Sequence, residues 1–377
     1  MAHPEPRRPR NALLAPVLAL LLALLLPAAA QAQSDLFEVR DVPVDVTAKS
    51  AAEARDQAVV QGQRKAWDML IGRLVSSEDA GRLPTPSDAQ LTDMVKSFEV
   101  EEEHVSDVRY IGKLAFSFRE SPVRDLLGGG QVHYAETVSK PILVVPVLTV
   151  DGKSELWEEG NGWRAAWSAR SSGGDLVPLL VPLGDAQDLA AIDAGQALAG
   201  DTARLLPLAE HYKAPDALVA EAQLLDGGKR LVVTGHRYGT GGNTATYQAT
   251  ATGDGQSLDA LFAQGAQRLA EQVQASWKQQ NLVTGGAEQT LAVRVPLTGL
   301  DNWVEVRRRL SQVATIKRSE VTYLSRQEAR LNLVFFGDPA QLAQAVAQRD
   351  LSLSQAPDGW VLAGGGAAAA PAPAPSN

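Results

Sequence analysis

The sequence contains no cysteine and little histidine. Without cysteine the chain has no disulfides, no thiolate zinc site, no cysteine nucleophile and no lipidated cysteine. The histidines beyond residue 32 are at least 25 residues apart, so a local metal pair such as H-E-x-x-H is absent. They are His104, His133, His211 and His236. The sequence also lacks a G-x-S-x-G nucleophile elbow, a Walker loop and a Rossmann fingerprint. We therefore assign no catalytic, cofactor-binding or metal-ligating residue, and we expect a protein that is not an enzyme.

Long apolar runs are scarce, and the longest lies at the N-terminus. Arg7-Arg8-Pro9-Arg10 precedes an apolar run from Ala12 to Leu26, and small residues follow up to Ala30-Gln31-Ala32. This order is typical of a secretory signal peptide cleaved after Ala32. The alternative is an uncleaved anchor, but the run has 15 residues, whereas a membrane span needs about 20. We predict a periplasmic protein of a Gram-negative bacterium, with no membrane span after cleavage.

Positive charge is also in deficit, because 35 lysines and arginines stand against 44 acidic residues, a net charge of -9. The segment 1–32 holds three arginines and one glutamate, so its removal takes away +2 and leaves -11. Such a surface repels phosphate backbones. Nucleic acid is therefore excluded as an expected partner.

Hydrophobic periodicity predicts an α/β (α+β) chain of three small mixed-sheet modules, the last of them ferredoxin-like. The predicted segments are 1–32 for the signal peptide, 35–127 for a β-α-β-β domain, 132–283 for a mixed α/β domain, 288–363 for the ferredoxin-like domain and 364–377 for a disordered Ala/Pro tail.

In the first module a strand over 36–46 changes face near Asp41, which predicts a β-bulge. Ser50 and Glu53 predict a capping box at the start of a long helix. The residues at helical spacing include many small ones, and small side chains let a helix lie close to a sheet. They are Ala51, Ala54, Ala58, Gly62, Ala66, Met69, Leu70 and Leu74. Two strands, 97–105 and 109–119, follow.

The second module contains the apolar run Ile142 to Leu148, which predicts a central strand buried on both faces. Helices are expected over 185–199, 201–212 and 258–277, and a meander of strands over 217–225, 230–238 and 244–252. The third module has the order β-α-β-β-α-β. Its predicted strands are 290–297, 315–324, 330–336 and 359–362, and its predicted helices are 301–310 and 338–348.

Several segments resemble an uncharacterised bacterial family, domain of unknown function (DUF) 2066. They are Ala52–Ala66, Arg109-Tyr110-Ile111-Gly112, the Pro146 strand with Leu156-Trp157, Trp163-Arg164-Ala165-Ala166-Trp167 and Leu176–Asp185. The resemblance implies an exported envelope protein without an assigned activity, and it carries no catalytic residue over. The element order of the second module is similar to that of the amino-terminal domain of TolB and of curli-secretion-type lipoproteins, which are interaction modules.

Two acidic clusters could supply paired carboxylates for a cell-wall hydrolase or ligands for calcium. One is Glu99, Glu101, Glu102 and Glu103, and the other is Asp151, Glu155, Glu158 and Glu159. In the first cluster Glu99, Glu101 and Glu103 alternate with apolar residues, as on the solvated face of a strand. The second lacks the spacing of a calcium loop, so neither cluster indicates an enzyme.

A tryptophan segment, Trp157, Trp163, Arg164 and Trp167, is the candidate recognition surface. Trp163 and Trp167 are four residues apart and share a helical face, which could meet a sugar or a partner's apolar side chain. The alternative is that they cover the core. Arg307-Arg308-Arg309 has two interpretations as well, a contact for an acidic partner or a solvated helix face.

Taken together, these patterns predict a non-catalytic module that binds other envelope proteins in cell-envelope assembly or maintenance. Binding of peptidoglycan or another glycan by the tryptophan segment is the alternative, and a cell-wall hydrolase is a second alternative.

Overall fold

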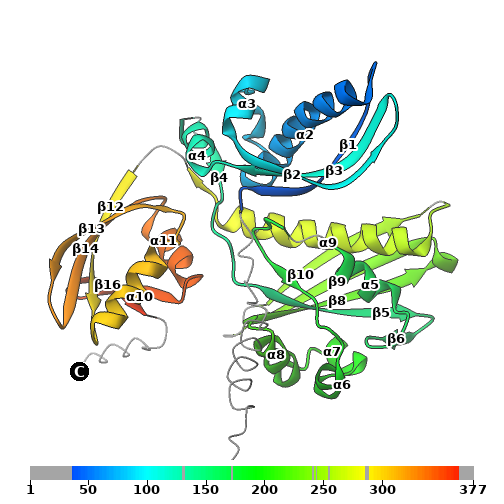
Figure 1. Cartoon of the computed structure of the whole chain (residues 1–377). Helices are drawn as coiled ribbons and strands as arrows, with labels where there is room; N and C mark the ends of the chain where they lie inside the picture. The colour runs from blue at the N-terminus through cyan, green and yellow to red at the C-terminus, as the bar shows by residue number, and fades with distance from the viewer. Residues whose placement is uncertain are drawn as a thin grey trace, which may run out of the picture. The chain divides into compact units, whose positions relative to one another are not determined.

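The computed structural model describes residues 36–129, 132–170, 173–239, 242, 244–253, 255–284 and 288–364. The predicted signal peptide lies outside the described residues, and so does the predicted tail except for Gly364. Three sheets of three, six and five strands are accompanied by helices, and a two-stranded sheet joins β4 to β11. The predicted mixed α/β class is confirmed (Figure 1).

The first sheet has the antiparallel order β1-β3-β2. Its elements are β1 (Glu38–Thr47), α2 (Ala51–Leu74), η1 (Ala80–Arg82), α3 (Asp88–Met94), β2 (Val95–Val105), β3 (Arg109–Phe118) and α4 (Glu120–Gly129). The predicted bulge is confirmed, because the β1–β3 register shifts between Val39 and Val42 and Asp41 has a φ of 54°. Helix α3 has no counterpart among the predicted elements.

Helix α2 lies close to β3 through its small residues. Gly62 is buried, and a Cβ built there would lie 2.9 Å from Cζ of Phe116. Met69 was predicted on the buried face but is 43% exposed, and Trp67 is buried instead. The capping box is formed only in part: the Ser50 hydroxyl accepts from the Glu53 N–H, but the Glu53 carboxylate accepts from the Lys49 N–H at 3.3 Å.

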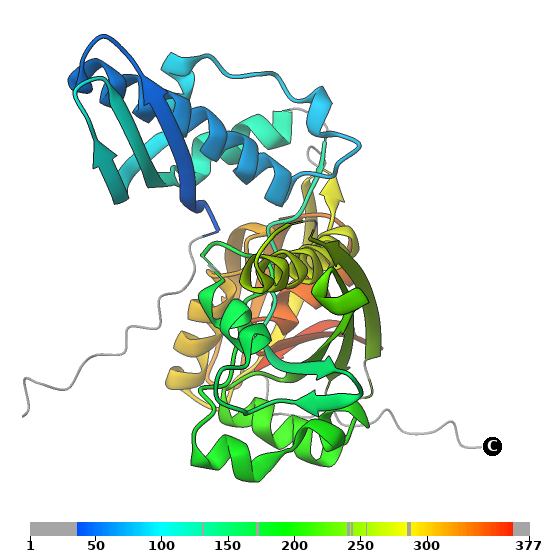
Figure 2. The same cartoon turned by 90° about the vertical axis from the view of Figure 1, so that its right-hand side faces the viewer.

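The second sheet has the order β10-β9-β8-β5-β6, with β7 beside β5. Its strands are β5 (Ile142–Val150), β6 (Lys153–Glu155), β7 (Leu179–Leu180), β8 (Asp216–Leu225), β9 (Arg230–Gly239) and β10 (Thr244–Thr252). The helices that accompany it are α5 (Gly162–Ala169), α6 (Ala186–Ala191), α7 (Ala194–Leu198), α8 (Thr202–His211) and α9 (Leu258–Gln280). The short η2 (Asp226–Gly228) lies between β8 and β9. Figures 1 and 2 show α9 on one face of this sheet and α6 to α8 on the other.

The predicted burial of β5 on both faces is confirmed. Ile142 and Val144 belong to the hydrophobic cluster under α9, whereas Leu143, Val145 and Val147 belong to the cluster under α7 and α8. Pro146 has no N–H and lies opposite Ala220 in the β5–β8 ladder, and the Ala220 carbonyl accepts from the indole N–H of Trp163 at 2.8 Å. The helix predicted over 185–199 is two helices, because Asp193 caps a new one after the extended residue Ile192.

The third sheet has the order β13-β14-β12-β16-β15, with β12 and β16 parallel. Its elements are β12 (Glu288–Pro296), α10 (Leu300–Leu310), β13 (Ile316–Leu324), β14 (Glu328–Phe336), α11 (Pro339–Ala347), β15 (Leu351–Ala356) and β16 (Gly359–Gly364). The predicted order β-α-β-β-α-β continues into one more strand, so the last strand, β16, runs parallel to β12, whereas a ferredoxin-like sheet is antiparallel throughout. Both helices pack on one face over the core of this sheet. Strand β15 was not predicted.

Two short strands, β4 (His133–Tyr134) and β11 (Val283–Thr284), pair with each other. One hydrophobic cluster contains residues of both α2 and α9, so the first two predicted modules share a core. The third sheet has a core of its own. The module boundaries themselves stay predictions.

Candidate functional site

The tryptophan segment is mostly part of the core. Trp163 and Trp167 are 0% and 2% exposed, and their rings meet edge to face with centroids 5.7 Å apart. The Trp163 indole N–H donates to the Ala220 carbonyl at 2.8 Å. The prediction of an exposed platform is wrong for these two rings, since both cover the core between α9 and the sheet.

The two other residues of the segment are half-buried. Trp157 donates its indole N–H to the Ile192 carbonyl at 2.7 Å. The guanidinium of Arg164 lies where a Cβ of Gly184 would be. The four side chains therefore do not form one exposed surface, and glycan binding loses the stacking platform on which it rested.

The acidic clusters are divided among separate partners. In the first, Glu102 pairs with Lys113 at 3.0 Å and Glu101 with Arg40 at 2.7 Å. A register shift between Val100 and Glu102 turns Glu103 toward Tyr110, whose hydroxyl donates to it at 3.0 Å. Among the described residues, no group of three or more His, Asp or Glu could hold a metal ion.

One contact between distant residues was not predicted. Asp79 is buried, and one of its carboxylate oxygens meets the His133 backbone N–H at 2.9 Å and the imidazole Nδ1 at 2.6 Å. These two hydrogen bonds, with further contributions from Ser76 and Arg82, lower the pKa of Asp79 to about 2. The Ser76 hydroxyl donates to Asp79 rather than to the imidazole, so no serine nucleophile is activated. The contact instead holds β4 against the end of α2.

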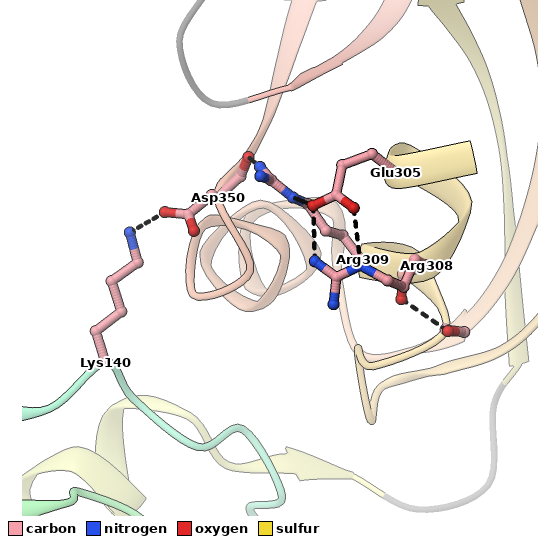
Figure 3. A network of polar contacts seen from close by, with 6 residues as sticks. Lys140, Glu305, Arg308, Arg309 and Asp350 are labelled. Atoms are coloured by element: carbon pink, nitrogen blue, oxygen red, sulfur yellow. Dashed lines mark hydrogen bonds and ion pairs between the residues drawn. The ribbon is translucent and has the colours of Figure 1, made fainter. Parts of the chain in front are cut away.

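Two of the three arginines in the basic island of α10 share one carboxylate of their own helix. Figure 3 shows Arg308 and Arg309 converging on Glu305, at 2.6 and 2.7 Å. Hydrogen bonds from both lower the pKa of Glu305 to about 2. Arg307 lies over the Trp303 ring at 5.8 Å. The arrangement supports the interpretation of a solvated helix face over that of a docking site for an acidic partner.

The edges of the sheets differ in how they are protected. At β10, the Gln272 side chain of α9 donates to the Gln248 carbonyl at 2.5 Å and accepts from its N–H at 3.1 Å, as a neighbouring strand would. Arg268 donates to the Thr250 carbonyl. At β1, Lys65 of α2 donates to the Pro43 carbonyl at 2.9 Å. Backbone groups that are already bonded cannot template a further strand.

Strand β13 has an open edge by contrast. Among the described strands it pairs with β14 alone, and two register shifts interrupt that ladder. Val321, Tyr323 and Leu324 are 46%, 50% and 52% exposed. Strand β2 is another edge, but four glutamates, all of one sign, lie along it, and such charge protects against pairing. The charges of β13 are of both signs and are paired, Lys317 with Glu288 and Arg318 with Glu320. The outer strand β15 exposes mainly serine and glutamine. Strand β13 is therefore the candidate interaction surface.

No model of a known protein family and no curated protein matches this chain. The resemblance to DUF 2066 and the likeness of the second module to TolB stay predictions. Of the helices in the described residues, none combines the length and the apolar character needed to cross a membrane.

The sequence could not single out β13. Its apolar residues are visible as a strand pattern, but whether an edge is open depends on side chains from elsewhere in the chain. Gln272 protects Gln248 from 24 residues away, and the sequence gives no signal for that contact. The four glutamates of β2 are the one protective feature that could have been predicted.

Proposed function

We propose that this chain is an exported, non-catalytic protein that binds other proteins of the cell envelope, and that β13 is its docking strand. The partner contributes an extended segment that adds to the sheet beside β13. The open, partly apolar edge of β13 is the observation that supports this function most directly. Export rests on the predicted signal peptide.

The expected affinity follows from the exposed side chains. Full burial of a large apolar side chain contributes about 1.5–3 kcal/mol. Three half-exposed residues would then add about 2–4 kcal/mol, which corresponds to no better than about millimolar binding. Main-chain hydrogen bonds along the strand must supply the rest. The register with β14 is regular from Arg318 to Val321 and again over Tyr323 and Leu324, so these two stretches are the ones suited to pairing.

Site-specific crosslinking in cells tests the proposal. A photo-crosslinking residue at position 323 should capture an envelope protein, and the same residue at position 252, on the protected β10 edge, should not. The double variant V321E/L324E should abolish capture from position 323, because it places charges against a partner's apolar side chains. The substitution Thr252→Glu is the matched control and should leave capture unchanged.

The proposal fails if no envelope protein is captured above background from position 323, or if V321E/L324E leaves capture as it was. Turnover of a cell-wall or lipid substrate by the purified protein would contradict the non-catalytic part.

A further inference from the structure

A pocket of about 440 Å³ lies beside the β4–β11 pair. Helix α4 contributes Arg124 to its lining, and the segment after β4 contributes Glu136. Thr315, just before β13, and Lys317 and Phe336 of the third sheet line it from a distant part of the sequence. The volume is in the range of small-molecule sites.

Two buried polar atoms in this lining have no hydrogen-bond partner. Glu136 is 5% exposed, and its Oε2 accepts from Nε of Arg124 at 2.7 Å, but its Oε1 has none. Thr315 is 6% exposed, and its Oγ1 has none either. A buried carboxylate oxygen without a donor is costly, and native structures rarely leave one without a reason. Both residues line one pocket, so a ligand held there lies next to both side chains.

The charges around the pocket favour a cation. Arg124 is shared between Glu136 and Glu120, the second at 2.9 Å, so one guanidinium serves two carboxylates. Lys317 is already paired with Glu288. Burial raises the pKa of Glu136 even though Arg124 opposes the shift. A second positive charge beside Oε1 would stabilise the ionised carboxylate of Glu136.

Besides the polar residues, which include Ser121 and Asp125, the lining has an apolar part. Tyr134, Val283, Ile316 and Phe336 line the pocket beside the charged groups. Such side chains suit a short hydrocarbon or aromatic body, and among the described residues no group of three or more His, Asp or Glu could hold a bare metal ion. The ligand should therefore carry its charge at one end.

We propose that this pocket binds a primary ammonium on a short aliphatic or aromatic body, with Oε1 of Glu136 as the main acceptor and Oγ1 of Thr315 as a second contact. This inference does not depend on the docking role of β13, and the two can fail separately.

Calorimetric titration of the purified protein with phenethylammonium chloride is the test, and 2-phenylethanol is the neutral control with the same body. The ammonium should bind saturably at one site and the alcohol at least about tenfold more weakly, because it lacks the charge. Glu136→Gln should reduce ammonium affinity by at least about tenfold for the same reason. Glu102→Gln alters a carboxylate that is paired with Lys113 outside the pocket and should change the ammonium affinity by less than about threefold.

Circular dichroism checks that each variant is folded. If Glu136→Gln does not fold, Thr315→Val takes its place and should weaken binding by about threefold or more through the lost hydroxyl contact. The proposal is overturned if the ammonium does not saturate a site or if the alcohol binds equally well. It is also overturned if folded Glu136→Gln binds the ammonium as tightly as the natural chain does. Where Glu136→Gln does not fold, the same outcome for Thr315→Val overturns it.

Discussion

Two glycines of α2 allow a sharp test of how closely this helix lies on the sheet. A Cβ at Gly62 would lie 2.9 Å from Cζ of Phe116 and 3.1 Å from Cδ1 of Leu114, whereas a Cβ at Gly72 meets nothing within 4 Å. Both positions are helical, so alanine should favour the helix by about 1 kcal/mol at either one. Phe116 is fully buried and cannot move aside freely.

The two substitutions should therefore change the free energy of unfolding differently. Gly72→Ala should stabilise the protein by about 0.5–1 kcal/mol. Gly62→Ala gains the same propensity but overpacks the core at a cost of about 1–3 kcal/mol, which makes it neutral to destabilising by about 2 kcal/mol. The difference between the two variants, about 1–3 kcal/mol, isolates the collision with Phe116, because helix propensity and effects on the unfolded chain largely cancel.

Urea unfolding followed by circular dichroism measures both variants against the natural chain. Comparable slopes of the transitions are required for the comparison, because a changed slope indicates a change in the unfolded or folded state. If Gly62→Ala is as stable as Gly72→Ala to within about 0.5 kcal/mol, the tight helix-to-sheet contact described for α2 is wrong.

Two further predictions concern the core and the buried acid. Trp163→Phe leaves the Ala220 carbonyl without its indole donor and should lower the free energy of unfolding, measured by urea unfolding, by about 1–3 kcal/mol. Trp157→Phe, at a half-buried position, should lower it by less. Equal losses would contradict the buried placement of Trp163. The folded pKa of Asp79, about 2, is below its ordinary value of 3.8, so its stabilising effect is complete above about pH 4 and is lost as the pH falls toward 2. Thermal melts of Asp79→Asn should therefore show a deficit in midpoint at neutral pH that shrinks as the pH approaches 2, and a deficit independent of pH would refute this linkage.

Local pattern was sufficient for much of the fold. The run Ile142 to Leu148 predicts a strand covered on both faces, and alternate residues of β5 do enter two different clusters. The change of face near Asp41 predicts the bulge of β1, because a period of two can be broken only by an extra residue. These features depend on neighbours in the sequence, so they are visible in it.

Local pattern was insufficient where a second segment decides the outcome. The spacing of Trp163 and Trp167 shows that they share a helical face but not which way it points, and α9 packing on that side buries both rings. The helix predicted over 185–199 breaks at Ile192, where the capping by Asp193 outweighed the continuous helical pattern.

By itself, the sequence determined the class of fold, the acidic charge, the lack of cysteine chemistry and the order of most strands and helices, because each follows from composition or from contacts between near neighbours. Only the tertiary structure decided which strand edge is open and which carboxylate oxygen lacks a partner. Arg124, Glu136 and Thr315 come from three separate segments, and Gln272 reaches β10 from a different helix. Such contacts form only when the chain has folded, so no local pattern records them.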